Sequence, residues 1–282
     1  MGTGQDAGIP QMGCSCKNCE AARWDPSRRR AGASLALVDT AGEKFYLVDA
    51  SLHMSGQVDR LLHTHVIAGL GALQGIFITH AHMGHIIGLS LLGKEAADVK
   101  RVTVFAALEV CEFLGFNPIF RRMVQRGNLR LGEILEGEAL ELFEGATITP
   151  FVVPHRKDAI LTYGYLITEK GEGDGKGRTI IYIPDMDLIT KEIKALVKDS
   201  DIALLDGTFF DMNELPGRDM SEISHPLIEE TIRTLGEMDT RIIFTHINHS
   251  NPVSDPSSKE YEHVTEAGHE IASEGLVLSL RA

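Results

Sequence analysis

The chain has 282 residues, with 27 Lys and Arg against 40 Asp and Glu, so its formal net charge is −13 with His neutral. This length and a hydrophobic content of 43% allow a substantial buried core. The acidic balance argues against a broad basic surface for nucleic acid. No segment approaches the ~18 apolar residues of a spanning helix, and the N-terminus lacks the basic and apolar regions of a secretory signal. We therefore expect a cytoplasmic protein without membrane or nucleic-acid partners.

Short apolar or alternating segments of strand length recur along the chain, and most of them are rich in β-branched or aromatic residues. In chain order, we predict strands at 34–39, 44–49, 75–79, 102–106, 139–143, 147–153, 161–168, 179–183, 202–205, 241–245 and 275–279. The glycine-rich segment 170–178 lies between two of these strands and predicts a hairpin with a long loop, not a domain boundary.

Helical patterns lie between many of the predicted strands. We predict helices at 58–70, 84–97, 107–126, 190–198, 226–235 and 257–273. Because strand–strand and strand–helix alternation both occur, we expect two facing sheets with helices outside them. The predicted fold class is α/β (α+β), a four-layer αββα sandwich, in one domain over residues 1–282.

Side chains of the metal-ligand type directly follow five of the predicted strands. They are His80, His82 and His85 after the strand 75–79, and then His155, Asp185, Asp206 and His246 after four later strands. If these strands are aligned, their C-terminal ends converge on one edge of the sandwich. Imidazoles and a carboxylate gathered there would suit a borderline divalent cation such as Zn²⁺, Mn²⁺ or Fe²⁺.

The segment from Thr79 to His85 reads THAHMGH and resembles the HxHxDH signature of the metallo-β-lactamase superfamily. The resemblance extends over nearly the whole chain and implies the four-layer αββα sandwich of that superfamily. It also implies two active-site metals and support of the site by Asp49. The implied ligands are His80, His82 and His155 for one metal, His85 and His246 for the other, and Asp185 as the bridge.

One position departs from the signature, because Gly84 stands where the signature has its aspartate. That aspartate normally completes the second metal site and orients the attacking water, and glycine cannot bind a metal. We therefore expect a weaker second site than in ordinary members. If another residue takes over this role, Asp187 and Asp206 are the nearest candidates.

Three of the four cysteines lie within six residues of one another, which is unlike the disulfide framework of a secreted protein and favours a reducing compartment. Three thiolates are one ligand short of a closed tetrahedral zinc site. His249 lies three residues after His246 and can face the opposite way. We predict a structural zinc site that ties a loop at residues 10–20 to the strand before His246. Its ligands are Cys14, Cys16, Cys19 and His249.

Two groups within the superfamily resemble the chain more closely. The segment 2–11, GTGQDAGIPQ, and the cysteine cluster resemble both the pyrroloquinoline-quinone biosynthesis protein B and the cyclic phosphodiesterase of the carbon–phosphorus lyase pathway. The second of these has a comparable zinc site of three cysteines and a histidine. The segment 206–209, DGTF, resembles the first group, whereas the His-x-His pattern resembles the second.

The DGTF segment and the later His225 also resemble an arrangement in tRNase Z-like phosphodiesterases. By that comparison, His225 would be the general acid for a leaving oxygen, and Asp206 would orient it. A histidine with a pKa near 6.5 suits this role. The alternative is a structural histidine near the start of a helix.

Three functions remain open from the sequence. The first is a metal-dependent hydrolase of a phosphodiester or another small anionic ester, acting through metal-activated water, with Asp185, Asp206 and His225 in its catalytic machinery. The second is a biosynthetic oxidoreductase similar to the quinone-pathway protein, with one Fe²⁺ at His80, His82 and His155. The third is a metal-binding relative without catalysis. We expect one structural Zn²⁺, one or two Zn²⁺, Mn²⁺ or Fe²⁺ ions in the active site, and a small anionic substrate. A homodimer is left open.

Overall fold

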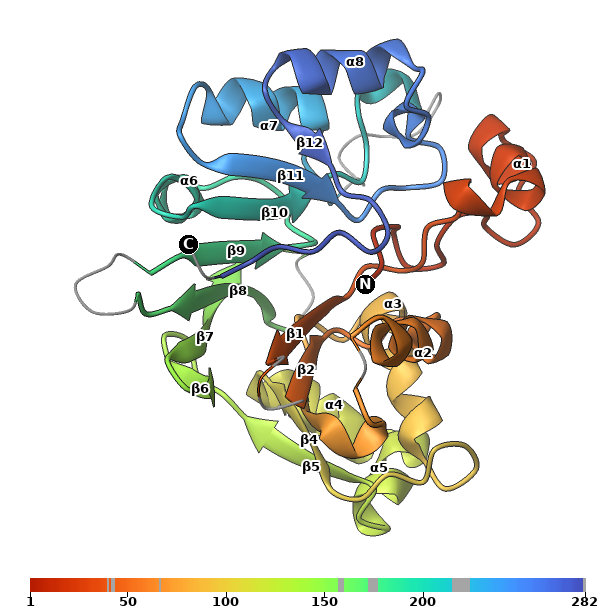
Figure 1. Cartoon of the computed structure of the whole chain (residues 1–282), viewed down its shortest axis with the longest axis vertical. Coiled ribbons are helices and arrows are strands. Elements are labelled where there is room, and N and C mark those ends of the chain that lie inside the picture. The colour runs from red at the N-terminus through yellow and green to blue at the C-terminus, as the bar shows by residue number, and fades with distance from the viewer. Residues whose placement is uncertain are drawn as a thin grey trace.

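The computed structural model describes residues 1–39, 41, 44–65, 67–156, 160–171, 177–214 and 224–280. Within these residues the strands form one sheet of five strands and one of seven. In Figure 1 the first sheet and its helices occupy the lower part of the view, and most of the second sheet lies above with its own helices.

The first sheet is built from the N-terminal half of the chain. Its strands, in spatial order, are β1 (Leu35–Asp39), β2 (Lys44–Val48), β3 (Leu73–Phe77), β4 (Val102–Ala106) and β5 (Leu129–Glu133). Only the β1–β2 pair of this described sheet is antiparallel. The helices that pack against it are α2 (Met54–Thr64), α4 (Leu108–Phe116) and α5 (Pro118–Gln125). The short α3 (Met83–Ile86) and a 3₁₀ helix (Ile87–Leu92) follow β3.

The second sheet joins antiparallel and parallel strands. Its spatial order is β12 (Glu270–Ile271), β11 (Arg241–Thr245), β10 (Ile202–Asp206), β9 (Thr179–Ile183), β8 (Thr162–Glu169), β7 (Ala146–Val153) and β6 (Leu140–Phe143). Strands β9 to β12 are parallel, whereas β6 to β9 pair antiparallel. Strand β7 therefore runs in the same direction as β9, β10 and β11, and all four end at the same edge of the sheet.

The side chains of β9 show how this sheet is buried on both faces. Ile180 and Tyr182 belong to the large apolar core that also contains the first sheet. Ile181 and Ile183 point the other way, into a second core. That core also holds the apolar faces of α6 (Lys191–Lys198), α7 (Ile228–Leu235) and α8 (Lys259–Glu266). Alternation along a strand thus places one face on the other sheet and one on helices.

The two sheets meet through aromatic side chains. The rings of Phe77, from β3, and Tyr165, from β8, lie edge to face with their centroids 5.8 Å apart. The Tyr165 hydroxyl donates a hydrogen bond of 2.7 Å to the Ile78 carbonyl oxygen. Helices, two facing sheets and further helices form four layers, so the predicted αββα sandwich is confirmed.

Several predicted helices end differently in the structure. The helix predicted at 107–126 is divided into α4 and α5 because Pro118 lacks an amide hydrogen, and the Asn117 side chain caps the new helix. The helix predicted at 257–273 stops at Glu266, just before Gly268, which has a φ of +80°. Among the described residues, no helix is long and apolar enough to cross a membrane.

Three strand assignments from the sequence are corrected by the structure, and one of them is the short β12, which lies within the helix predicted at 257–273. The segment 275–279 is not a strand, although its apolar residues Leu276 and Leu278 pack against the core. Strand β5 was missed, because its short LRLGE sequence has one buried residue and a glycine. The predicted hairpin forms as β8 and β9, and residues 172–176 of its loop lie outside the described residues.

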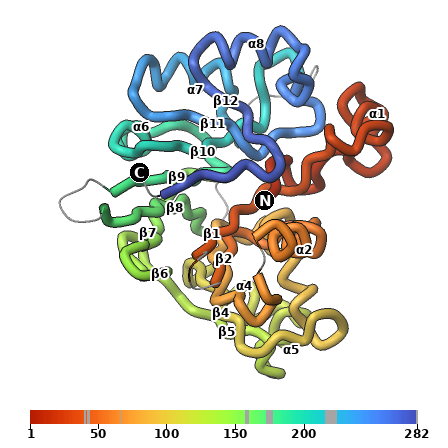
Figure 2. Tube along the Cα trace, in the orientation of Figure 1, coloured from red at the N-terminus to blue at the C-terminus, as the bar shows by residue number. Residues whose placement is uncertain are grey.

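The N-terminal segment connects the two halves of the molecule. Gly4 forms bridges both to Gly32, before β1, and to Ile247, after β11. In Figure 2 the N-terminus lies between the part of the chain with β1 to β5 and the part with β9 to β12. A Cβ atom on Gly2 would lie 2.1 Å from the Gly32 carbonyl oxygen. The close approach of the N-terminal segment to the segment before β1 therefore requires glycine at position 2. This segment leads directly to the cysteine cluster.

Candidate metal centre

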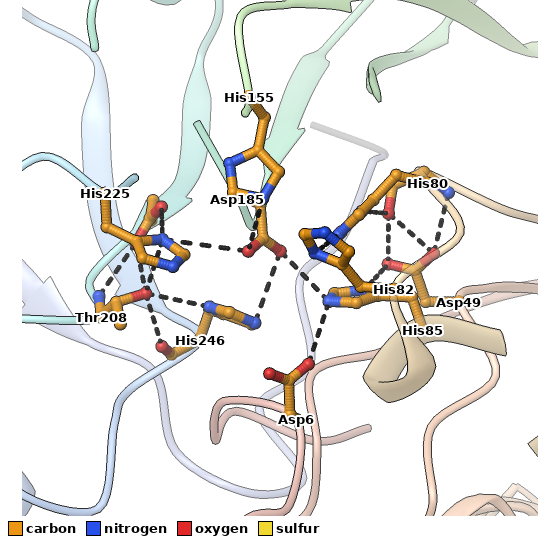
Figure 3. A network of polar contacts seen from close by, with 12 residues as sticks. Asp6, Asp49, His80, His82, His85, His155, Asp185, Thr208, His225 and His246 are labelled. Carbon is orange, nitrogen blue, oxygen red and sulfur yellow. Dashed lines mark hydrogen bonds and ion pairs between the residues drawn. The ribbon is translucent and has the colours of Figure 1, made fainter. Parts of the chain in front are cut away.

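The loop after β3 carries three of the histidines that the sequence singled out. His80 follows the strand, His82 is the N-cap residue of α3, and His85 lies within that helix. The Nε2 atom of His80 lies 2.8 Å from Nδ1 of His82. His155, which follows β7 in the other sheet, completes a group with His80 and His82 whose ligand atoms all lie within 4.8 Å of one another. Figure 3 shows these rings converging from both sheets.

Asp185 lies at the centre of the cluster, after the end of β9. Its Oδ2 atom is 3.2 Å from Nε2 of His85 and 3.4 Å from Nε2 of His246. Its Oδ1 atom is 3.7 Å from Nε2 of His155. The carboxylate is therefore close to His155 and also to His85 and His246 (Figure 3).

Asp49 holds the loop after β3 from behind. Its carboxylate accepts hydrogen bonds of 2.9 Å from the Thr79 amide and 3.0 Å from the Thr79 hydroxyl, and it lies 2.8 Å from Nδ1 of His85. Asp49 is fully buried and has a φ of +63°, a left-handed conformation that costs on the order of 1–3 kcal/mol in a non-glycine residue. This contact orients the His85 ring so that Nε2 faces Asp185.

A second buried network holds the other side of the cluster. The Thr208 hydroxyl is 3.0 Å from Nδ1 of His246 and donates a 2.7 Å hydrogen bond to Asp206. Asp206 Oδ2 lies 2.8 Å from Nδ1 of His225, and that nitrogen is 3.9 Å from Asp185 Oδ1. His225 is thus held at the margin of the cluster, beside Asp185 (Figure 3).

Burial favours the neutral imidazole at three of the cluster histidines. Burial lowers the pKa of His80 well below its usual range, and burial also lowers the pKa values of His82 and His246. Burial would lower the pKa of His85 too, but the Asp49 and Asp185 carboxylates outweigh it and raise this pKa well above its usual range. His85 would give up its proton on binding a cation.

The donor set fits a divalent metal. Among the described residues, Nε2 of His155, Oδ2 of Asp185 and Nε2 of His246 are buried without a hydrogen-bond partner. Such groups are costly unless something else satisfies them. Imidazole nitrogens with carboxylate oxygens are the ligands of borderline divalent cations. Several buried polar atoms aimed at one point therefore match a cation held there.

Comparison with known proteins decides the family. The model of the beta-lactamase superfamily domain matches residues 44–247. The chain belongs to the beta-lactamase superfamily. Coenzyme PQQ synthesis protein B of Rhodopseudomonas palustris (strain BisB5) is 27% identical over 309 residues, which cover 99% of this chain and 98% of that protein. The same protein of Methylorubrum extorquens (strain PA1) is 26% identical over 300 residues, with coverage of 99% and 98%.

Solved structures agree with this family. The Zn²⁺-bound PqqB from Methylobacterium extorquens has a TM-score of 0.85 and 26% identity, covering 99% of this chain and 98% of that one. A diphosphatase from the PhnP family has a TM-score of 0.71 and 24% identity, with coverage of 99% and 96%, which supports the fold. The resemblance to the metallo-β-lactamase superfamily, and within it to the protein B group, is confirmed.

The chain departs from the superfamily motif at Gly84, and the structure places the carboxylate of another residue beside this position. A Cβ atom on Gly84 would lie 1.9 Å from Oδ1 of Asp6, from the N-terminal segment. That oxygen is 3.8 Å from Nε2 of His85, and Asp6, His85 and His246 form a group of possible ligands within 4.8 Å of one another. Sequence reasoning missed Asp6, which is 78 positions from Gly84 and lies in no local ligand pattern.

The two residues named as substitutes for the motif aspartate have other partners. Asp187 Oδ1 lies 3.4 Å from Nδ1 of His155 and accepts a 2.9 Å hydrogen bond from the Arg156 amide. Asp206 contacts His225 and Thr208. Neither belongs to the group around His85 and His246 that contains Asp6. The structure therefore places Asp6, and neither Asp187 nor Asp206, in a group with His85 and His246.

The four predicted zinc ligands also lie together. Nδ1 of His249 is 3.4 Å from Sγ of Cys14 and 3.5 Å from Sγ of Cys16, and Cys19 completes a group within 4.8 Å. Cys19 is in α1 (Lys17–Trp24) and not in a loop, so the predicted loop at 10–20 ends earlier than expected. Burial raises the pKa of Cys19 to about 12, so a thiolate at this position needs a neighbouring cation.

A cavity opens beside the His225 margin of the metal centre. It has a volume of about 350 Å³ and lies between the segment after β9 and helix α7. Its polar lining includes Asp187 and His225, and its apolar lining includes Leu188, Met212 and Leu227. A small substrate held in this cavity would contact His225.

Proposed function

We propose that the protein is a metal-dependent hydrolase of a phosphodiester or another small anionic ester. The observation that carries the proposal is the pairing of His225 with Asp206, 2.8 Å apart, at the margin of a cluster built for divalent cations. In this proposal one cation would be held by His80, His82 and His155, and another by His85 and His246, with Asp185 between them. Membership of the beta-lactamase superfamily supports such a centre.

When bound, divalent cations supply Lewis acidity and a water-derived nucleophile at neutral pH. The chain's own residues supply orientation and a proton. Asp49 and Thr208 hold His85 and His246 in the rotamers that face Asp185. Burial acts to lower the pKa of His225, but Asp206 raises it to about 9, so its imidazolium is present at neutral pH. A protonated histidine at this margin can donate its proton to a leaving oxygen.

The substrate class follows from charge and space. The chain carries a formal charge of −13, and Asp6, Asp185 and Asp187 surround the site, so an anion would be repelled by the protein alone. Bound cations would reverse the sign of the electrostatic potential at the cluster. The partly apolar cavity of about 350 Å³ suits the uncharged leaving group of a small ester.

The direct test is hydrolysis of bis(p-nitrophenyl) phosphate by protein reconstituted with Zn²⁺ or Mn²⁺. We expect turnover that disappears on chelation and in His155→Ala. Turnover should persist in the control His63→Ala, because the His63 side chain is 81% exposed on α2. No turnover of any small phosphodiester or carboxylate ester by the metal-loaded protein would contradict the proposal.

A second function is favoured by the similarity to PqqB over 99% of the chain with a TM-score of 0.85. The protein would then be a biosynthetic oxidoreductase in coenzyme PQQ synthesis, with a single Fe²⁺ at His80, His82 and His155. This alternative predicts one redox-active iron and consumption of dioxygen. A protein that stays without active-site metal when Zn²⁺, Mn²⁺ or Fe²⁺ is added would contradict both enzyme functions and favour the relative without catalysis.

We also propose a structural zinc ion at Cys14, Cys16, Cys19 and His249. Three thiol sulfurs and one imidazole nitrogen are the donor set of a closed tetrahedral zinc site. The site would join α1 to the segment after β11. That junction is also supported by Asn18, whose side-chain amide donates to the carbonyl oxygens of His249 and Asn251 at 3.0 and 2.8 Å.

A further inference from the structure

The space beside Gly84 is occupied by a carboxylate from a distant part of the chain. An ideal Cβ on Gly84 would lie 1.9 Å from Oδ1 and 2.7 Å from both Cγ and Cα of Asp6. No side chain at position 84 fits while Asp6 stays where it is. The aspartate of the superfamily motif would start from this same point, so Asp6 and a motif aspartate exclude each other.

Asp6 faces the histidines that such an aspartate would join. Its Oδ1 lies 3.8 Å from Nε2 of His85, and its carboxylate forms a group with His85 and His246 within 4.8 Å. In Figure 3 the carboxylate points at His85 from the side opposite Asp185. The His85 side chain is 1% exposed and the Asp6 side chain 49%, so Asp6 closes the cluster on its solvent side.

The backbone around Asp6 fixes this position. The Gln5 amide donates a 2.9 Å hydrogen bond to the Ile247 carbonyl oxygen, and the Ile247 amide donates to the Thr3 carbonyl oxygen at 2.9 Å. Ile247 directly follows the ligand His246. Asp6 therefore emerges from a segment paired to the residue next to one of its proposed co-ligands, and the position does not depend on its side chain alone.

We propose that Asp6 is a ligand of the second active-site metal and replaces, from the N-terminal segment, the aspartate that Gly84 lacks. The site would consist of Asp6, His85 and His246 with Asp185 shared, so it carries the same number of carboxylates as the ordinary motif. This inference rests on the proposed two-cation centre, but it concerns metal binding and not the reaction.

The test counts metals in three matched variants. After Mn²⁺ loading and removal of free metal, elemental analysis of the wild-type chain should give two manganese ions besides one structural zinc. Asp6→Asn keeps the size of the side chain and removes its charge, and it should bind the second manganese at least about tenfold more weakly. The control Asp59→Asn removes a 77% exposed carboxylate from α2 and should bind both ions as the wild-type chain does.

The third variant is Gly84→Asp. It should lose the second ion, because its new side chain collides with Asp6. Two tightly held manganese ions in Asp6→Asn, or a single active-site ion in the saturated wild-type chain, would overturn the inference. Loss of the ion in Asp6→Asn without hydrolysis in any variant would keep the inference and reject the proposed reaction.

Discussion

At the scale of single residues, four of the five metal-centre histidines have an oxygen atom close to Nδ1. The contacting residues are Thr79 for His80, Asp49 for His85, Asp187 for His155 and Thr208 for His246. Such contacts select the tautomer and fix the ring, so the nitrogens facing the centre need little reorganisation to bind a cation. His225 has the same kind of support from Asp206 but lies at the margin of the cluster. We therefore assign it the role of proton donor and not of metal ligand.

The role of His225 can be tested through the leaving group. His225→Ala should lower kcat at least about 100-fold on a diester with a poor alkoxide leaving group, and under about tenfold on a p-nitrophenyl diester, whose leaving oxygen needs no proton. Metal content should not change. Equal losses on both substrates would show that His225 acts on metal binding or folding and not on proton donation.

The candidate residues were predictable to the extent that they lie near strand ends. His80, His155 and His246 each follow a buried strand, and the direction of parallel strands explains why they meet. Asp6 was not predictable in this way, since its position depends on backbone pairing with Ile247, more than 240 positions away. Gly84 signalled that a ligand was missing, but nothing local indicated its replacement.

At the scale of elements, the short 3₁₀ helix η4 (Met212–Glu214) supports the segment after β11. Glu214 accepts hydrogen bonds from the Phe210 amide and, at 3.2 Å, from the Ser250 hydroxyl, one residue after His249. Burial raises the pKa of this carboxyl to about 7. The folded chain therefore holds a proton there that the unfolded chain releases near pH 4.5.

The raised pKa of Glu214 predicts how the stability of the chain depends on pH. Between pH 4.5 and about 7 the folded state binds more protons than the unfolded state, so the free energy of unfolding contributed by Glu214 falls as pH rises. Glu214→Gln should remove this slope and stabilise the chain by about 1–3 kcal/mol at pH 8, with little effect at pH 4. Urea unfolding at the two pH values measures the difference. An equal change at both would contradict the assignment.

The elements themselves were mostly predictable from apolar patterns. Strands such as β9 (TIIYI) and β11 (RIIFT) are mostly apolar, β-branched or aromatic, as expected of strands buried on both faces. The pattern failed where burial depends on distant partners. Helix α1 has little apolar periodicity and begins at the cysteine cluster, and β5 is a strand because β4 pairs with it.

At the scale of the whole molecule, the N-terminal segment connects both proposed metal sites. It carries Asp6 at the active site and the cysteines at the zinc site. The segment after β11 carries His246 and His249 to the same two places. Glycine bridges at Gly4 join the two segments directly. A change at one metal site should therefore alter metal binding at the other.

His249→Ala tests this connection. Zinc content should fall by one ion, and the midpoint of thermal unfolding should fall, because three thiolates no longer form a closed site. The ion at His80, His82 and His155 should remain, whereas the site that includes Asp6 should bind more weakly. Unchanged zinc content in His249→Ala, with His63→Ala as the control, would reject the proposed zinc ligands.

In the proposed function, two cations held around Asp185 make the protein a hydrolase. The most direct measurement is the initial rate of phosphodiester hydrolysis against the number of Mn²⁺ ions bound per chain. We predict that the rate rises mainly as the second active-site ion binds, and that Asp6→Asn shifts this rise to higher metal concentration. A chain that holds both ions and hydrolyses no small anionic ester, or one that consumes dioxygen with a single bound iron, would contradict the proposed function.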